Sequence, residues 1–459
     1  MKLIATVCLL ACSVLFNNGL LANLSVPSIW GDHMVLQQNA EVKIHGWGHP
    51  IEKVMITTSW NADTVRTEVD NYANWSAVLH TPEAGGPHTI KIEGYNTLQI
   101  EDVLVGELWL LSGQSNMEWT TGAGIIGGDE ATEKARNNEI RFFEVTNRTA
   151  DYPAYDVDGY WEVCTPETMP NFSAIGYFFG EKLQDNLKIP VGLISSNWGG
   201  TPIETWIPGD SIFNNGELFE ASKLLKEYPW APISPGVCYN AMIAPLMPLA
   251  IAGVLWYQGE ANTDNPDSYA DMLSVMVESW RKGFQCDFTF CFAQIAPLAG
   301  YEPEAGVKVR DAQRRALSIP NSGMIVLSDI GDTTDIHPKN KIPAGQRFAD
   351  LVLNKTYGMK EFPVSGPLFS DYRVDGKKVI VSFDYNNGLH INGKELTLFE
   401  LAGVDGVWYP AKAAIKKNQV VVSSSEVNEP VDVRYAWSNP ATPKLFNSWG
   451  LPASCFTSK

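Results

Sequence analysis

The sequence has little positive charge for its size. Its 34 lysines and arginines are outnumbered by 52 aspartates and glutamates, which gives the 459 residues a formal net charge of −18 at pH 7. A chain this acidic is repelled by phosphate backbones and by anionic lipid surfaces. We therefore expect no nucleic-acid partner. The net charge says little about a small substrate, because a few residues set the field around it.

Long hydrophobic runs are absent after the first residues. Residues 1–22 combine an early Lys2 with the apolar segment Leu3–Leu10, and the composition changes at Asn23. We interpret residues 1–22 as a signal peptide and expect a secreted or periplasmic protein. A lipoprotein signal ending at Cys12 is the alternative. No later run approaches the ~18 apolar residues that span a membrane, so we expect no transmembrane segment after signal removal.

Cysteine is also scarce. An odd number in a large chain argues against a disulfide framework. Cys286 and Cys291 could pair, but we expect buried thiols around the strand Phe288–Phe292. The cysteines that remain after the signal are Cys164, Cys238, Cys286, Cys291 and Cys455.

Histidine is rarest in the middle of the chain. Of seven histidines, His337 alone lies between residues 103 and 360. Ser115 follows the apolar run Leu108–Leu111 and a turn containing Gly113. A serine at the end of a buried parallel strand is well placed for chemistry, although a helix-capping serine is the ordinary alternative. If Ser115 is a nucleophile activated from its own domain, the base must be His337.

Hydrophobic periodicity divides the mature chain into three parts. Strand-like alternation at both ends surrounds a middle part in which buried strands alternate with helices, the pattern of a parallel sheet covered on both faces. The expected strands of the middle part are Leu108–Leu111, Val191–Ser195, Val254–Tyr257, Phe288–Ile295 and Met324–Ser328, and its expected helices are Ala174–Leu187, Tyr269–Arg281, Val309–Leu317 and Ala344–Asn354. The predicted divisions are a signal peptide 1–22, an N-terminal β domain 23–102, an α/β domain 103–360 and a C-terminal β domain 361–459.

Polar, glycine-containing segments follow several of these strands. Ser196–Trp206 and Gln258–Asn262 each come directly after a buried strand, and the loops Gly122–Asn138 and Gly209–Pro235 are long enough to shape a cleft. Backbone N–H groups of glycines and asparagine side chains are the donors that acyl transfer needs around a tetrahedral intermediate. We expect these segments to gather at one edge of the sheet.

Four of these stretches together resemble a known family. GQSNMEW, SNWGGTPIETW, WYQGEAN and DIHPKNK occur in the order seen in the sialate O-acetylesterase family of the SGNH-hydrolase superfamily. The resemblance covers most of the mature chain. It implies an α/β fold, a flavodoxin-like three-layer domain with a parallel sheet, flanked by N- and C-terminal β-sandwich-type regions.

The resemblance also implies catalytic roles. Ser115 would be the nucleophile and one oxyanion donor, and His337 the base. Gly200, or else Gly199, would be the second oxyanion donor, and Asn262 the third.

One position departs from the family. The superfamily places an aspartate three residues before the histidine, where this chain has Thr334. We expect Asp335 to orient His337; Asp332, Glu260 or a backbone carbonyl are the alternatives.

The implied reaction is removal of an O-acetyl group from a carbohydrate through an acetyl-serine intermediate, without a metal or an organic cofactor. We expect 9-O-acetylated sialic acid as the substrate. Acetylxylan or another plant glycan is the alternative. A non-catalytic carbohydrate-binding protein is a further alternative, against which the complete Ser, Gly, Asn and His set argues.

The sequence says less about the residues that bind the substrate than about the catalytic residues. A sialic acid carboxylate would favour an arginine, and Arg310 resembles a family motif, although a surface arginine paired with an acid is the alternative. Gln114, Glu260 and Trp198 are further candidates for contacts with the sugar. Trp119, Trp206 and Tyr257 could either stack on sugar rings or belong to the core.

Overall fold

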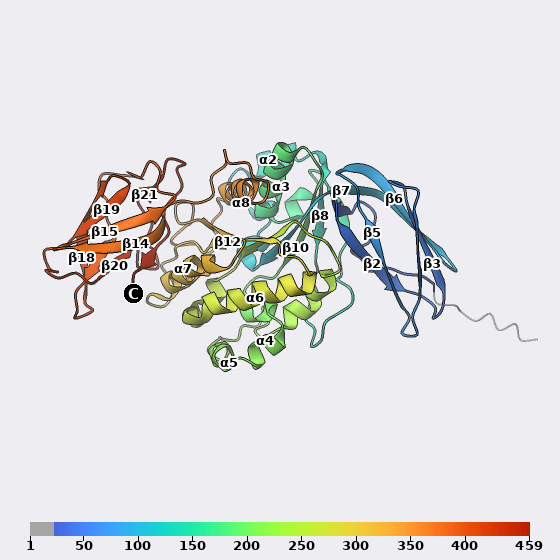
Figure 1. Ribbon diagram of the computed structural model, residues 1–459, viewed down its shortest axis with the longest axis horizontal. Helices are drawn as coiled ribbons and strands as arrows, with labels where there is room; N and C mark the ends of the chain where they lie inside the picture. Colours follow the sequence, from blue (N-terminus) through green and yellow to red (C-terminus); the bar gives the residue numbers. More distant parts are fainter. Residues whose placement is uncertain (1–22) are drawn as a thin grey trace, which may run out of the picture.

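The computed structural model describes residues 23–459, so the expected signal peptide and Cys12 lie outside the described residues. Three regions follow one another along the long axis of the molecule, with β structure at both ends and an α/β region between them (Figure 1). Among residues 23–459, no helix has the length and apolar character that crossing a membrane requires.

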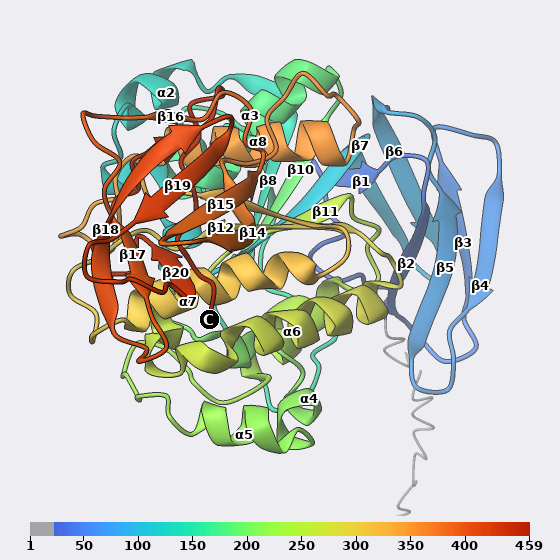
Figure 2. The ribbon, with the colours of Figure 1, turned by 60° about the vertical axis from the view of Figure 1, so that its left-hand side comes forward.

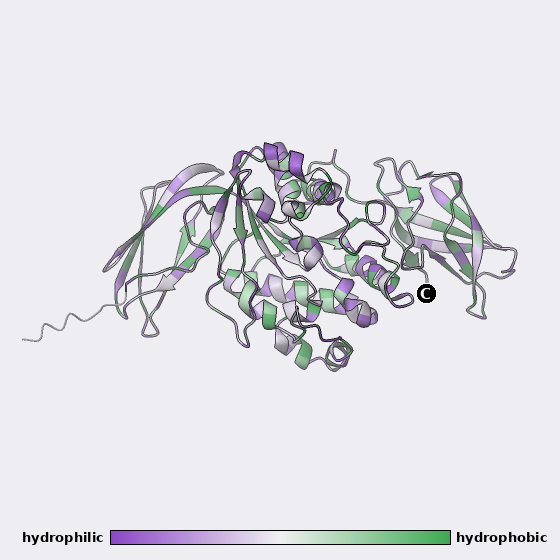
Figure 3. Cartoon of the chain, turned by 180° about the vertical axis from the view of Figure 1, so that it is seen from behind, coloured by the Kyte–Doolittle hydropathy of each residue, from purple (hydrophilic) through white to green (hydrophobic). Residues whose placement is uncertain are grey.

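The middle region is built on a largely parallel sheet. Its strands follow the order β13-β12-β11-β7-β10-β8-β9, and every neighbouring pair is parallel except β8 with β9. Figure 3 shows hydrophobic residues concentrated on these central strands, as expected for a sheet buried on both faces. The strands are β7 (Thr97–Gly113), β8 (Asn137–Glu144), β9 (Trp161–Cys164), β10 (Val191–Asn197), β11 (Gly253–Tyr257), β12 (Thr289–Gln294) and β13 (Ser322–Val326).

Helices cover both faces of this sheet. Figure 2 shows α3 and α8 on one side and α6 and α7 on the other. The expected α/β fold with a three-layer domain is therefore confirmed. The helices are α1 (Ser115–Glu118), α2 (Gly128–Lys134), α3 (Ala174–Leu187), α4 (Gly209–Phe213), α5 (Gly216–Ser222), α6 (Tyr269–Phe284), α7 (Ala305–Arg315) and α8 (Ile342–Lys355).

The N-terminal region shares a strand with the middle region. The first half of β7 pairs with β6, and its second half lies between β10 and β11 in the central sheet. The boundary that we expected between residues 102 and 103 thus falls inside one continuous strand. The other strands of this region are β1 (Val35–Gln37), β2 (Glu41–Trp47), β3 (Lys53–Thr58), β4 (Thr64–Glu68), β5 (Asn74–His80) and β6 (Gly85–Glu93).

The C-terminal region has its own hydrophobic core and an antiparallel sheet in the order β14-β15-β19-β18-β17-β20-β22. A short pair, β16 with β21, lies beside it. The strands are β14 (Leu368–Asp375), β15 (Lys378–Asp384), β16 (His390–Ile391), β17 (Phe399–Ala402), β18 (Trp408–Lys416), β19 (Gln419–Ser423), β20 (Asp432–Tyr435), β21 (Leu445–Phe446) and β22 (Phe456–Thr457).

Strand β8 was missed from the sequence because charged residues interrupt its apolar pattern. Arg141 lies in the middle of β8 and is buried. Its guanidinium is 2.7 Å from the Asp102 carboxylate, which balances the buried charge. The two long loops that we expected are partly helical. Gly122–Asn138 contains α2, and Gly209–Pro235 contains α4 and α5.

The five cysteines of the described chain are unpaired, and Cys286 is exposed rather than buried.

The C-terminal region packs onto the middle region through α7. Asn439 accepts hydrogen bonds from the N–H groups of Gly306 (3.0 Å) and Val307 (3.2 Å), in the first turn of this helix. Arg310, also on α7 and buried, donates to the carbonyl groups of Ser438 (2.7 Å) and Asn439 (3.1 Å). Two regions of the chain are thereby joined by buried polar contacts.

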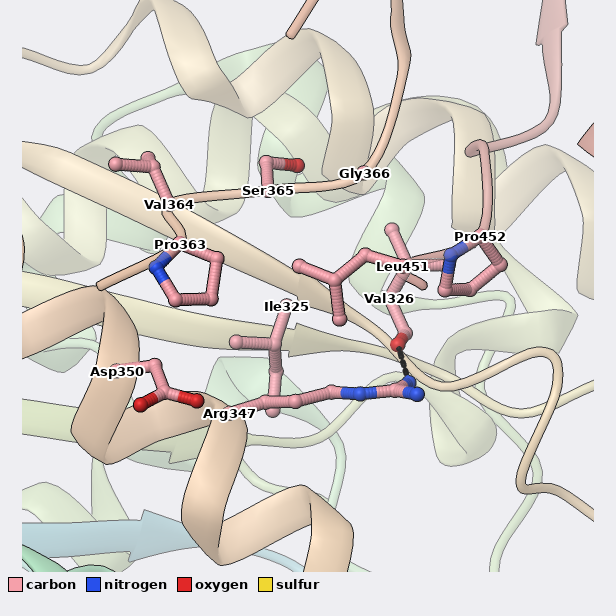
Figure 4. Close-up of a pocket in the computed structure, with 10 residues that line it drawn as sticks. All are labelled: Ile325, Val326, Arg347, Asp350, Pro363, Val364, Ser365, Gly366, Leu451 and Pro452. Atoms are coloured by element: carbon pink, nitrogen blue, oxygen red, sulfur yellow. Dashed lines mark hydrogen bonds between the residues drawn. The ribbon is translucent and has the colours of Figure 1, made fainter. Parts of the chain in front are cut away.

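A linker closes the other side of this junction. Figure 4 shows Pro363–Gly366 passing close to Pro452 over a small cavity, with Arg347 of α8 bonded to the Val326 carbonyl. The cavity of about 10 Å³ has room for about one water molecule. It is a packing feature of the junction and not a ligand site.

Substitution of Arg310 tests the junction. In Arg310→Met, the buried Asn439 carbonyl and the partly buried Ser438 carbonyl lose their donors, so we expect the variant to be destabilised by about 1–3 kcal/mol and to show a lower Tm. Arg315→Met is the matched control, because Arg315 lies on the same helix and is half-exposed. KM should be unchanged in both variants. A raised KM with an unchanged Tm in Arg310→Met would instead give Arg310 a role in substrate binding.

Candidate active site

The site forms where three adjacent parallel strands end in register. Gly113 at the end of β7 lies opposite Asn197 of β10 and opposite Tyr257 of β11. The segments that follow these strands therefore leave the sheet at the same edge, as the sequence predicted.

A glycine makes the turn before Ser115 possible. Gly113 has a φ of +138°, which L side chains rarely adopt, and a Cβ there would collide with the Tyr257 carbonyl. Gln114 then donates its backbone N–H to that same carbonyl at 3.0 Å. Ser115 is the first residue of α1, so its N–H has no partner within the helix.

Ser115 and His337 are brought together. The distance from His337 Nε2 to Ser115 Oγ is 2.9 Å, although 222 residues separate them in sequence. His337 lies in the loop between β13 and α8, and its ring stacks on Trp119 with a centroid distance of 4.3 Å and an interplanar angle of 22°. Burial lowers the pKa of His337 below its usual value, and the charge of Lys341 acts in the same direction. Trp119 therefore contacts the base, a role that we did not expect.

The acidic residues near His337 serve the loop rather than the ring. Asp335 accepts a hydrogen bond from the backbone N–H of His337 (2.9 Å), and Asp332 accepts from the backbone and hydroxyl of Thr334 (2.8 and 2.7 Å). Asp329 forms an ion pair with Arg347 at 2.6 Å. Within residues 23–459, no carboxylate is hydrogen-bonded to His337 Nδ1. The expected acid, Asp335, thus orients the backbone of the base and not its imidazole.

Two backbone N–H groups of residues that line the cavity have no partner in the described part of the chain. The N–H of Gly199 is already bonded to a carboxylate oxygen of Glu118 at 2.7 Å. The N–H groups of Ser115 and Gly200 have no hydrogen-bond partner in the described part of the chain. Gly200 has a φ of +80°, and the adjacent Gly199 lies beside the Ser115 side chain. Of the two glycines that we considered, Gly200 is therefore the one with an available donor.

Asn262 is not among the described residues that line the cavity over Ser115 and His337. Its side chain is fully buried, its Nδ2 donates to Glu204 (2.9 Å) and Asn265 (3.0 Å), and its Oδ1 accepts from Gln258 (2.8 Å). Both amide hydrogens are used, so none remains for an oxyanion. Asn262 holds the turn after β11, and the expectation that it donates to the substrate is replaced by this structural role.

Gln114, unlike Asn262, lines the cavity and has a side-chain amide whose N–H groups are unused in the described chain. Its Oε1 accepts from Gln258 Nε2 (3.1 Å) and from the N–H groups of Gly259 (3.4 Å) and Ala261 (3.2 Å). Three donors around one oxygen fix the orientation of the amide. Its Nε2 is left without a partner in residues 23–459, and Gln114 lines the cavity beside Ser115.

A cavity of about 730 Å³ opens over Ser115 and His337. Trp198 and Glu260 line it, as expected. Arg310 does not, because its guanidinium is used at the junction with the C-terminal region. Trp206 and Tyr257 are buried in the core.

Acidic and aromatic residues dominate this cavity. Four carboxyl groups line it, but Lys226 is the one lysine or arginine among the described lining residues, and its Nζ is 2.8 Å from Asp264. Tyr228 and Trp230 stack on each other at 4.9 Å, and the Trp230 side chain is 62 % exposed. Both come from the loop that we expected to shape a cleft. The four acidic residues are Glu118, Glu260, Asp264 and Glu302.

Two buried polar residues beside the site were missed. Asn116 and Lys341 each lie within a stretch that carried the family resemblance, directly after Ser115 and four residues after His337. Nothing in the sequence pattern shows that their side chains meet, yet Lys341 Nζ is 2.5 Å from Asn116 Oδ1.

Comparison with known proteins is consistent with this geometry. Residues 105–354 match the family of carbohydrate esterases described as sialic acid-specific acetylesterases. The matched segment begins in β7 and ends in α8, so it includes Ser115 and His337.

The relatives extend the similarity over nearly the whole chain. The sialate O-acetylesterases of Homo sapiens and Pongo abelii are each 29% identical over 472 residues, which cover 92% of this chain and 90% of each relative. The crystal structure of a carbohydrate acetylesterase from Xanthomonas citri is similar with a TM-score of 0.87 and 32% identity, and the match covers 95% of this chain and 99% of that one. The chain belongs to the carbohydrate esterase family of sialic acid-specific acetylesterases and is a carboxylic ester hydrolase.

Proposed function

We propose that the protein removes O-acetyl groups from a carbohydrate through an acetyl-serine intermediate. The observation that carries the proposal is the 2.9 Å contact between Ser115 Oγ and His337 Nε2 at the edge of a 730 Å³ cavity. His337 takes the hydroxyl proton as Ser115 attacks the acetyl carbonyl carbon, and then gives that proton to the departing sugar oxygen. Water activated by His337 next attacks the acetyl-serine and releases acetate.

The negative charge of each tetrahedral intermediate needs donors. We propose the N–H groups of Ser115 and Gly200 as two of them, and the Nε2 of Gln114 as a third in place of Asn262. Their lack of partners within residues 23–459 supports this assignment, because donors that are already placed and unused cost no reorganisation during the reaction.

The charges of the cavity favour a neutral sugar over sialic acid. A sialic acid carboxylate needs a cation or several donors to replace its water. The described lining offers three carboxyl groups, Glu118, Asp264 and Glu302, and a fourth, Glu260, whose pKa is raised by burial. Its one lysine is already paired with Asp264. A neutral acetylated glycan avoids this repulsion, and the exposed Trp230 face offers an apolar surface for a sugar ring. We therefore propose a neutral O-acetylated glycan as the preferred substrate, and 9-O-acetylated sialic acid as the second candidate because the curated relatives are sialate O-acetylesterases.

Acetate release from two substrates distinguishes these candidates. With acetylated xylan and 9-O-acetylated sialic acid as substrates, we expect kcat/KM to be at least about tenfold higher for xylan, since one added charge repulsion is worth about 1.4 kcal/mol or more in a partly buried site. Ser115→Ala should lose at least about 1,000-fold in kcat on both. A preference for sialic acid would contradict the proposed substrate, and undiminished release by the variant would contradict the mechanism.

The pH profile tests the role of His337. The base must be neutral to accept a proton, and burial lowers its pKa from the usual value near 6.5. Activity should therefore rise with pH, and the acidic limb of kcat/KM should have its midpoint below pH 6.5. A midpoint well above pH 6.5 on the chosen substrate would show that the imidazole is not the group that titrates, or that a nearby anion dominates its field.

A further inference from the structure

The side chain of the residue after Ser115 has a complete set of hydrogen bonds. Asn116 is fully buried on α1. Its Nδ2 donates to Glu260 Oε1 at 2.6 Å and to the Ile336 carbonyl at 2.9 Å, and its Oδ1 accepts from Lys341 Nζ at 2.5 Å. Both hydrogens and the oxygen of one amide are satisfied, so the side chain has one orientation.

Each partner belongs to a segment that builds the site. Ile336 directly precedes His337, and Lys341 ends the same loop just before α8. Glu260 lies in the turn after β11 and lines the cavity. A single amide therefore connects the nucleophile turn to the loop that carries the base, with one contact on each side of His337.

The hydrogen bonds of Asn116 hold the His337 loop in position, whereas the acidic residues near His337 make no hydrogen bond with its ring in the described chain. No carboxylate in residues 23–459 is hydrogen-bonded to the imidazole, and the hydrogen bond from His337 to Asp335 is made by its backbone N–H. Stacking on Trp119 fixes the plane of the ring but allows it to slide in that plane. The position of the loop along the nucleophile turn is then set by the bonds from Asn116 to Ile336 and Lys341.

We propose, on the basis of the function proposed above, that Asn116 is a positioning residue that holds the His337 loop against Ser115, and that Lys341 is its charged partner. The amide bonds to the loop on either side of His337 and not to the imidazole ring. It acts on the distance between the two reacting side chains and does not contact the substrate.

The charge of Lys341 adds an electrostatic effect. Lys341 is 2 % exposed, and burial lowers its pKa to about 7, while Glu260 and Asp335 act in the opposite direction. At pH values below this pKa the Lys341 side chain carries a positive charge. Its charge disfavours a second positive charge on His337, whose other charged neighbour is Asp335.

The first test is Asn116→Ala, with Asn447→Ala as the matched control. Asn447 is an equally buried asparagine, bonded to the carbonyl groups of Ser365 (2.9 Å) and Tyr385 (3.1 Å) in the C-terminal region. We expect kcat of Asn116→Ala to fall about 100-fold with KM within threefold of the parent, because a displaced base slows the chemical step. The rate at which a fluorophosphonate labels Ser115 should fall in parallel. The control should lower Tm and leave kcat and labelling unchanged.

Asn116→Asp covers the case in which the alanine variant does not fold. The aspartate has the same shape and still accepts from Lys341, but it cannot donate to Ile336 or Glu260. We expect the same loss of kcat. If a folded Asn116 variant keeps its kcat, or if Asn447→Ala loses as much, the positioning role is wrong.

Lys341→Met tests the effect of the Lys341 charge on His337 separately from the effect of the variant on stability. Removal of the cation should move the acidic limb of kcat/KM to higher pH by several tenths of a unit, an effect that simple loss of stability does not produce. An unchanged limb would contradict the electrostatic part. Activity retained by Ser115→Ala would overturn the proposed function itself, so the two failures are distinguishable.

Discussion

The site depends on the register of three parallel strands. Because Gly113, Asn197 and Tyr257 are paired across β7, β10 and β11, the three segments that follow them leave the sheet at one level. Gly113 lets the first of these segments turn sharply against the Tyr257 carbonyl, which places Ser115 at the start of α1. A shift of one residue in any of these pairs would change the level at which the following segment leaves the sheet, and it would turn the side chains of that strand to the opposite face.

The base is held by packing and by backbone contacts. Trp119 stacks on the ring of His337, Asp335 bonds to its backbone, and Asn116 bonds to the residue before it. None of these groups stabilises the imidazolium as strongly as a carboxylate on Nδ1 would. This arrangement agrees with a His337 pKa that is lowered and not raised, and it suits a base that must be neutral when the substrate binds.

The polar residues near the site divide according to whether their hydrogen bonds are complete. Asn262 uses both of its amide hydrogens within the described chain, and Arg310 directs its guanidinium to the carbonyl groups of Ser438 and Asn439, so they support the turn after β11 and the junction with the C-terminal region. Gln114 and Gly200 keep unused donors at the cavity. A satisfied polar group supports the structure, and an unsatisfied one at a cavity is available to a ligand.

Much of this was determined by the sequence alone. Helix α3 was predicted with its observed ends, and the parallel strands of the middle region other than β8 were found from their apolar runs. Ser115 and His337 could be paired because no other histidine lies in that part of the chain. Local patterns suffice for such features, since periodicity and residue scarcity do not depend on distant contacts. The tertiary structure decided which polar side chains point into the cavity. The strand β8 was hidden because Arg141 finds its partner Asp102 39 residues earlier in the chain. Arg310, Asn262 and Asn116 each contact a residue that is distant in sequence. The direction of a side chain and its partners follow from tertiary packing, and the spacing of residues in the sequence does not reveal them.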